Sequence, residues 1–169
     1  IMRWTVSGVR NDSTTSLQSF YWRDTLPTDA VRLTRLVTGT YSTTQTYKVT
    51  FTTNLNSQWR TAYDNLSTAK NYTLDMSSAA LRLASSEYVT QFMLSFGIVP
   101  AGFHQLTNAT VDAQTLYALT NGYKFTNKAD VGGLLGGNWV QSIARWTTSI
   151  YSHYVPAKPA APKSPTLPR

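Results

Sequence analysis

The sequence predicts an all-β protein, an antiparallel β-sandwich or jelly roll of about ten strands with at most one short helix. Three observations lead to this prediction. Thr, Tyr, Val, Phe and Trp dominate the body of the chain, and strands favour these residue types. Apolar residues recur at every second position in several runs, which places one face of each strand on a core. Turn residues separate the runs, and no helical pattern is long enough to connect parallel strands.

The first half of the chain contains four expected strands. They cover residues 4–9, 17–23, 31–37 and 46–53. In the third strand, Val31 and Leu33 alternate with Leu36, which is expected on the opposite face. The fourth strand alternates most clearly, with core-facing Tyr47, Val49 and Phe51 set against solvent-facing Lys48, Thr50 and Thr52.

The middle of the chain combines shorter strands, a helical candidate and one long strand. The shorter strands are expected at 58–63 and 71–76. Residues 77–84 could form two helical turns, because Ser77 or Ser78 can cap a run of good helix formers. Residues 87–99 form the longest period-two run, whose core-facing residues are expected to be Phe92, Leu94, Phe96 and Ile98.

The last part of the body is expected to contain a hairpin, a loop and a final strand. Residues 111–119 and 122–127 flank Asn121-Gly122, a strong two-residue turn signal. The glycine-rich segment 129–137 is expected to be a loop; it lacks the Lys-Ser/Thr of a phosphate-binding loop. Residues 139–154 are expected to form a strand or a bent pair of strands. Three Trp side chains lie in phase with apolar neighbours and are expected in the core: Trp22, Trp139 and Trp146.

Composition indicates one domain, residues 1–154, followed by an extended Pro/Ala/Lys-rich stalk at 155–169. The formal net charge is +7, from 15 basic and 8 acidic residues. The basic residues are scattered, unlike the runs that neutralise phosphates, so we expect no nucleic-acid partner. A basic jelly-roll coat or nucleic-acid-binding protein is the second alternative function. The absence of cysteine excludes a disulfide framework, a Cys-type zinc site and a thiol nucleophile. No segment approaches the length of a membrane span.

We expect no catalytic, cofactor or metal site. His104 and His153 are far apart in the sequence, with no carboxylate at a metal-ligand spacing. The chain contains no Gly-Xaa-Ser-Xaa-Gly motif, and no pair of carboxylates stands out as acid and base.

Four stretches in the body, together with the tail, carry a resemblance to a known family. The stretches lie within residues 21–41, 47–54, 87–103 and 121–133. Together they resemble the membrane-proximal β domain of sortase-anchored surface proteins of Firmicutes, which are adhesin-like or pilin-like chains. The stalk ends on Leu167, Pro168 and Arg169, which look like the first part of the Leu-Pro-Xaa-Thr-Gly sorting signal. The Thr-Gly, the hydrophobic segment and the basic tail of that signal are not in this sequence, nor are upstream domains.

The resemblance implies a structural and adhesive module on the cell surface, with no enzymatic activity. It would act as a rigid spacer next to the cell wall, with sortase and peptidoglycan as partners and with a host or microbial glycan or protein as a further ligand. Pilin-type domains related to this family often cross-link Lys to Asn in the core, beside a buried acid. The candidates here are Lys48 or Lys124 for the lysine, Asn127 for the amide, and Asp24, Asp130 or Glu87 for the acid. Both lysines lie out of phase with their apolar neighbours, so they are expected to point to water and to form no cross-link.

Glycan binding is the main alternative function. The chain has five Trp and ten Tyr residues, more than a core of this size requires. Exposed aromatic rings on a β-sandwich can stack on the C–H faces of sugars. Trp59, Tyr63 and Tyr72 lie in short strands and loops, and they are the expected platform.

Overall fold

A computed structural model of the chain describes residues 1–117 and 119–149, those after Ser142 by their backbone alone. These residues form twelve β-strands and no helix, which confirms the predicted all-β class. All strand pairs are antiparallel. Within the same ranges, no helix is long and apolar enough to cross a membrane.

Six strands form the larger sheet. Their bounds are β2 Leu17–Thr25, β5 Thr46–Thr53, β6 Arg60–Ser67, β8 Val89–Val99, β11 Lys124–Leu135 and β12 Asn138–Ser149. Their order across the sheet is β12-β11-β2-β8-β5-β6. The edges of this sheet are therefore β12 and β6.

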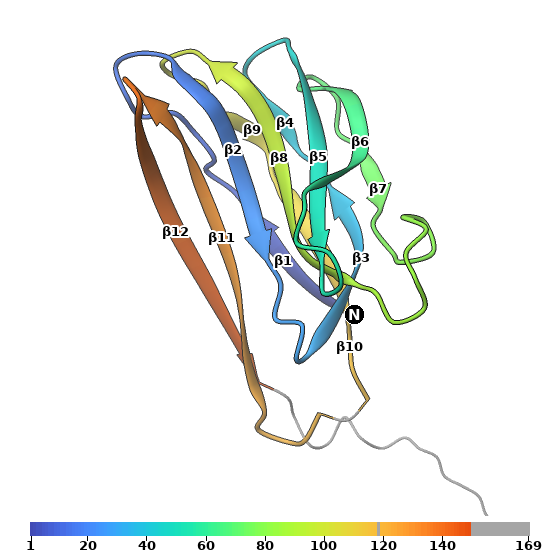
Figure 1. Cartoon of the computed structure of the whole chain (residues 1–169). Coiled ribbons are helices and arrows are strands. Elements are labelled where there is room, and N and C mark those ends of the chain that lie inside the picture. Colours follow the sequence, from blue (N-terminus) through green and yellow to red (C-terminus); the bar gives the residue numbers. More distant parts are fainter. Residues whose placement is uncertain (118, 150–169) are drawn as a thin grey trace, which may run out of the picture.

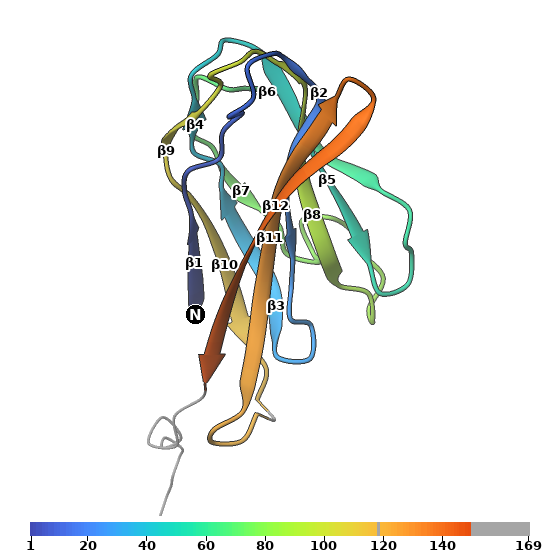
Figure 2. The same cartoon turned by 90° about the vertical axis from the view of Figure 1, so that its left-hand side faces the viewer.

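Four strands form the second sheet, and two more form a small separate pair. The four are β1 Met2–Val6, β3 Val31–Val37, β7 Thr73–Asp75 and β10 Ala109–Thr115, in the order β1-β10-β3-β7. The separate pair is β4 Thr40–Tyr41 with β9 Gln105–Thr107. Figures 1 and 2 show the two larger sheets packed face to face, as in a β-sandwich.

The core between the sheets is rich in aromatic rings. Trp22 is fully buried, as its phase predicts, and its ring meets Phe92 edge-on with 5.6 Å between centroids. The Trp22 indole N–H donates a hydrogen bond to the Tyr41 hydroxyl (2.9 Å), which in turn donates to the Thr38 carbonyl (2.8 Å). These bonds satisfy the polar tips of two buried rings. A cluster of neighbouring rings extends the core: Phe20, Tyr41, Tyr47, Phe96 and Phe103.

Two strands were predicted with their correct bounds. β3 and β5 begin and end where the alternation places them. Two faces differ from the prediction, however. Thr50 and Thr52 are buried, because β5 is an interior strand between β8 and β6. Leu36 is buried together with Leu33, because the pairing with β10 shifts between Asp112 and Ala113 and reverses the alternation.

The predicted inward position of Ile98 is wrong for a related reason. Gly97 has a positive φ of 74°, and the register between β2 and β8 shifts beside it. The bulge turns Ile98 outward, where it is 63 % exposed, and brings Val99 into the core instead.

The predicted hairpin between residues 111–119 and 122–127 does not form. β10 pairs with β1 and β3, whereas β11 pairs with β12 and β2 in the other sheet. The loop predicted at 129–137 is also wrong, because β11 continues to Leu135. Gly136 and Gly137, with φ of 56° and 85°, make the tight turn into β12, and two positive φ values are what a type I′ hairpin turn requires.

Residues 77–84 form turns instead of the predicted helix. The amide of Leu81 bonds to the carbonyl of Ser77 (3.0 Å) and the amide of Leu83 to that of Ser78 (2.9 Å). Arg82 then takes a positive φ of 57°, which ends the helical path after about one turn. The segment is too short to repay the cost of helix nucleation.

Candidate functional site

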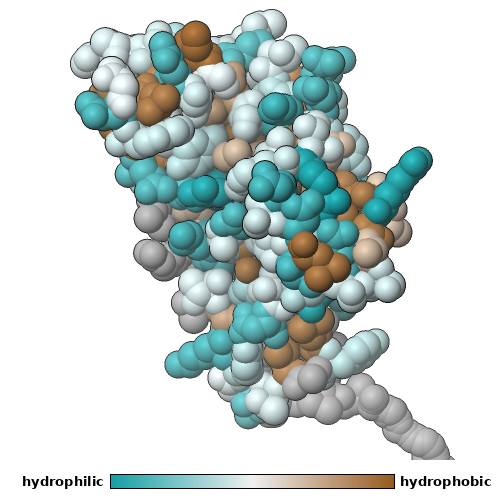
Figure 3. Space-filling model, in the orientation of Figure 1, coloured by the Kyte–Doolittle hydropathy of each residue, from teal (hydrophilic) through white to brown (hydrophobic). Residues whose placement is uncertain are grey.

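The outward face of the six-stranded sheet carries a groove of about 780 Å³. Its lining residues come from five strands, β2, β5, β6, β8 and β12, and from Trp59 just before β6. The side chains that give it chemical character are Tyr21, Arg23, Lys48, Trp59, Asp64, Trp139 and Gln141. Figure 3 shows this side of the molecule as mainly hydrophilic or neutral, with isolated apolar patches.

Strand register places the polar residues of the groove in one row across the sheet. Gln141 is opposite Gly132, Gly132 is opposite Tyr21, Tyr21 is opposite Ser95, and Ser95 is opposite Lys48. Residues directly opposite each other share a face of the sheet. Five neighbouring strands, from β12 to β5, thus contribute to one continuous floor.

Bulges shape this floor. Besides Gly97, the non-glycine residues Ser19 and Asn65 have positive φ values of 49° and 53°. Ser19 lies at the register shift between β2 and β8, and Asn65 lies where β6 has extra residues opposite Lys48 of β5. Bulges bend and twist a sheet and redirect side chains. The bulge at Asn65 accounts for the position of its neighbour Asp64 on the groove side.

Tyr21 and Trp139 form the aromatic wall on the β12 side. Their rings meet edge-on, with 6.2 Å between centroids. A Cβ atom at Gly132 would lie 2.5 Å from the Val140 carbonyl oxygen and 3.0 Å from the Tyr21 hydroxyl. Glycine at 132 therefore lets the Tyr21 ring lie across β11.

The buried carboxylate of Asp130 holds the side chain of Tyr21 in place at the groove. Asp130, fully buried, accepts hydrogen bonds from the Tyr21 hydroxyl (2.8 Å), from two nitrogens of Arg23 (3.0 and 2.7 Å) and from the Gln141 amide (2.7 Å). Burial acts to raise the pKa of Asp130, but the bonds from Arg23, Gln141 and Tyr21 outweigh burial and hold this pKa below its usual range. The carboxylate stays charged and neutralises Arg23.

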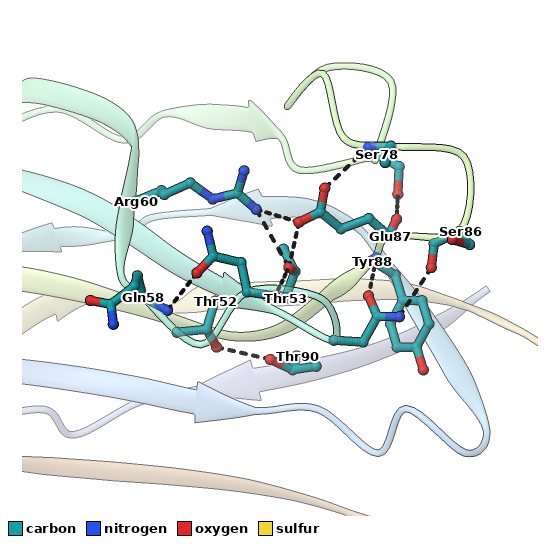
Figure 4. A network of polar contacts seen from close by, with 12 residues as sticks. Thr52, Thr53, Gln58, Arg60, Ser78, Ser86, Glu87, Tyr88 and Thr90 are labelled. Atoms are coloured by element: carbon teal, nitrogen blue, oxygen red, sulfur yellow. Dashed lines mark hydrogen bonds and ion pairs between the residues drawn. The ribbon is translucent and has the colours of Figure 1, made fainter.

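A second polar network positions Trp59 on the opposite side. The neighbouring Arg60 donates to the Glu87 carboxylate (2.5 Å), which also accepts from the Thr53 hydroxyl (2.5 Å) and the Ala84 amide (3.1 Å). Figure 4 shows this network tying the hairpin of β5 and β6 to the loop before β8. The anchored Arg60 sets the start of β6, and Trp59, one residue earlier, remains 38 % exposed in the groove.

Of the three residues of the expected aromatic platform, only Trp59 lines the groove. Tyr63 and Tyr72 are half-buried against the core and do not line the groove. The Tyr63 hydroxyl donates to the Asp75 carbonyl (2.8 Å), and the Tyr72 hydroxyl accepts from the Ser67 amide (2.9 Å). The second Trp of the groove is Trp139, which was predicted in the core but is 63 % exposed. Alternation along β12 marks two faces without saying which one is buried.

The cross-link candidates are brought together only in part. Asp24 and Asn127 are both fully buried, and the Asn127 amide donates to Asp24 Oδ2 (2.8 Å). Lys48 and Lys124 are exposed, on strand positions that point away from the core. The structure thus shows a buried acid–amide pair, with both lysines in solvent.

The remaining residues considered in the sequence analysis are the histidines and the sorting-signal candidates. Among the described residues, no group of three His, Cys, Asp or Glu side chains could hold a metal ion. His104 is exposed, and its Nδ1 lies 2.9 Å from the Gly102 carbonyl oxygen. The sorting-signal candidates Leu167, Pro168 and Arg169 lie outside the described residues, as do His153 and the side chain of Trp146.

No family model, curated protein or solved structure matches this chain. The resemblance to sortase-anchored proteins therefore stays a prediction. Arguments for function come from the groove itself.

Proposed function

We propose that this protein is a non-enzymatic glycan-binding module, which uses the groove on its six-stranded sheet. The observation that carries the proposal is the pair of exposed indole rings, Trp59 and Trp139, at opposite edges of a floor that carries several polar side chains. Indole rings left in solvent on a structured groove are suited to stacking on the C–H faces of sugars. The floor between them supplies the hydrogen-bonding groups that sugar hydroxyls need.

The groove chemistry favours binding over hydrolysis. Of the described residues that line the groove, one is a carboxylate, Asp64. Asp130 lies beneath the floor, where Arg23, Tyr21 and Gln141 occupy its oxygens. Glycoside hydrolysis ordinarily needs two carboxyl groups that flank the scissile bond. A single rim carboxylate supports recognition instead.

The test is binding of the whole chain to a broad panel of immobilised glycans, followed by titration of each hit with intrinsic Trp fluorescence as the readout. Trp59→Ala and Trp139→Ala should each weaken binding about tenfold, equivalent to about 1.4 kcal/mol. Tyr117→Ala is the matched control, because Tyr117 is exposed but lies outside the groove. Absence of any hit, or equal losses in all three variants, would contradict the proposal.

We also propose that the module is displayed on a Gram-positive cell surface. The support is the order of the sequence: a β-rich body, a Pro/Ala/Lys-rich stalk and then Leu167-Pro168-Arg169. Sortase and peptidoglycan would be the partners of this segment. Reading the codons that follow Arg169 tests the idea. Thr-Gly followed by an apolar run and basic residues is the expected result, and a stop codon or another globular domain would refute it.

A further inference from the structure

We propose, building on the glycan function above, that the groove takes an uncharged, unbranched saccharide chain that lies diagonally across the strands. In this arrangement Trp59 and Trp139 stack on sugar units near the two ends of the chain. Lys48 and Asp64 bind hydroxyl groups of the sugar units that lie between the two Trp rings. The inference rests on three features of the groove: its charge balance, its direction and its free hydrogen-bonding capacity.

The charges of the groove cancel. Arg23 and Lys48 contribute two positive charges, and Asp64 and the underlying Asp130 contribute two negative charges. Arg23 and Asp130 are bonded to each other at 2.7 Å, which removes both from contact with a charged ligand. An acidic glycan would meet one ammonium group beside one carboxylate, so the groove offers no net attraction for it.

The direction of the groove follows from where the Trp residues lie. Trp139 belongs to edge strand β12, and Trp59 immediately precedes β6 at the other edge. Neighbouring strands are about 4.8 Å apart, so the five steps between these edges span about 24 Å. The register from Trp139 leads across the sheet to the Ser67 end of β6, whereas Trp59 precedes the Arg60 end, so the two rings are also offset along the strands. A ligand that touches both rings must therefore be a chain of several sugar units that runs diagonally across the strands.

Lys48 and Asp64 have hydrogen-bonding capacity to spare. Among the described residues neither forms an ion pair, and the Asp64 carboxylate accepts one bond, from the Asn65 amide (2.8 Å). An ammonium group offers three donors and a carboxylate several acceptor positions. Sugar hydroxyls both donate and accept, so a donor and an acceptor from facing strands can bind one sugar together.

The test is calorimetric titration of the whole chain with two matched sets of oligosaccharides. One set is neutral gluco-, manno- and xylo-oligosaccharides of increasing length, and the other is oligogalacturonates of the same lengths. Neutral chains should bind more tightly as they lengthen, until they span the groove. Their affinity should change less than about twofold when salt rises from about 0.05 M to about 0.5 M, because little charge attraction is involved.

Two variants test the inner residues. Lys48→Met and Asp64→Asn should each weaken binding of long neutral chains by about threefold to tenfold, whereas Lys124→Met, an exposed lysine elsewhere on the larger sheet, should leave it unchanged. Thermal melts of all three variants should match the wild-type melt, so that a loss reports binding and not folding.

The outcomes separate this inference from the glycan proposal. Tighter, salt-sensitive binding of oligogalacturonates, or equal affinity for one sugar unit and for a long chain, would overturn the inference and leave glycan binding standing. Unchanged affinity in both Lys48→Met and Asp64→Asn would overturn the assigned roles of these residues. Binding of no glycan in either set or on the panel would overturn both proposals.

Discussion

A carboxyl group with an incomplete set of partners lies inside the sandwich. Burial raises the pKa of Asp24 to about 7, although the hydrogen bond from Asn127 opposes the rise. Asp24 Oδ1 and Asn127 Oδ1 have no partner of their own. A proton on Asp24 would give Oδ1 a hydrogen to donate and would remove a charge that is costly at this depth. The folded state therefore favours the neutral acid.

Asp24→Asn should stabilise the protein at pH 8 and have little effect at pH 4. The pKa of Asp24 in the folded state is raised from 3.8 to about 7. The contribution of Asp24 to the free energy of unfolding is therefore most favourable below pH 4, falls as pH rises to about 7 and is constant above that pH. The full change is roughly 4 kcal/mol. Asn keeps an acceptor for the Asn127 amide and carries no charge. We expect a gain at pH 8 on the order of 2 kcal/mol, read from urea unfolding at several pH values.

The control for this experiment is Asp12→Asn, since Asp12 is an exposed carboxylate on the surface. It should leave the slope of stability against pH as in the wild type, whereas Asp24→Asn should flatten the fall between pH 4 and pH 7. An Asp24→Asn protein that loses stability equally at every pH would show that Asp24 is held charged in the core.

At the scale of single elements, sequence periodicity predicted the bounds of β3 and β5 correctly. It did so although the pairing of both strands contains register shifts. Prediction failed where the backbone departs from the regular pleat. The bulge at Gly97 reverses the face of Ile98. A glycine inside a strand can mark a bulge, but the apolar alternation of β8 by itself does not show the reversal. A bulge depends on the partner strand, which a local sequence window does not contain.

Strand β11 illustrates a second limit of prediction from the sequence. Its glycines were read as a loop, but Gly132 and Gly133 are buried where side chains of β2 lie across them. A Cβ on Gly133 would approach Leu17 Cβ at 3.2 Å. These glycines therefore report a close approach between strands instead of a turn. Only Gly136 and Gly137, at the end of the run, provide the turn itself.

The sequence allowed single residues of the candidate site to be predicted, but not their assembly into a groove. Trp59 could be singled out because it is a large aromatic residue among turn-forming and polar neighbours. Tyr21, Lys48 and Gln141 are far apart in the sequence, and strand register alone brings them into one row. Without the pairing order β12-β11-β2-β8-β5, the groove has no sequence signature.

At the scale of the whole molecule, the ends of the described chain bear on the predicted role as a rigid spacer. The start of β1 and the end of β12 lie toward the same end of the sandwich, as Figures 1 and 2 show. Both strands are sheet edges. A force applied between these two points would peel each edge strand from its end and break its hydrogen bonds one after another. A force along the strands would have to break them together.

This geometry predicts that pulling between residues 1 and 149 unfolds the protein at lower force than pulling between residues 1 and 138. Asn138 begins β12 at the opposite end of that strand, so the second pair loads β1 and β12 in shear. The chain contains no cysteine, and Ile1→Cys paired with Ser149→Cys or with Asn138→Cys gives unique attachment points for single-molecule stretching. A higher force for the pair 1 and 149 would support a load-bearing spacer. A lower force would mean that the module hangs beside the line of tension, with its groove free to bind.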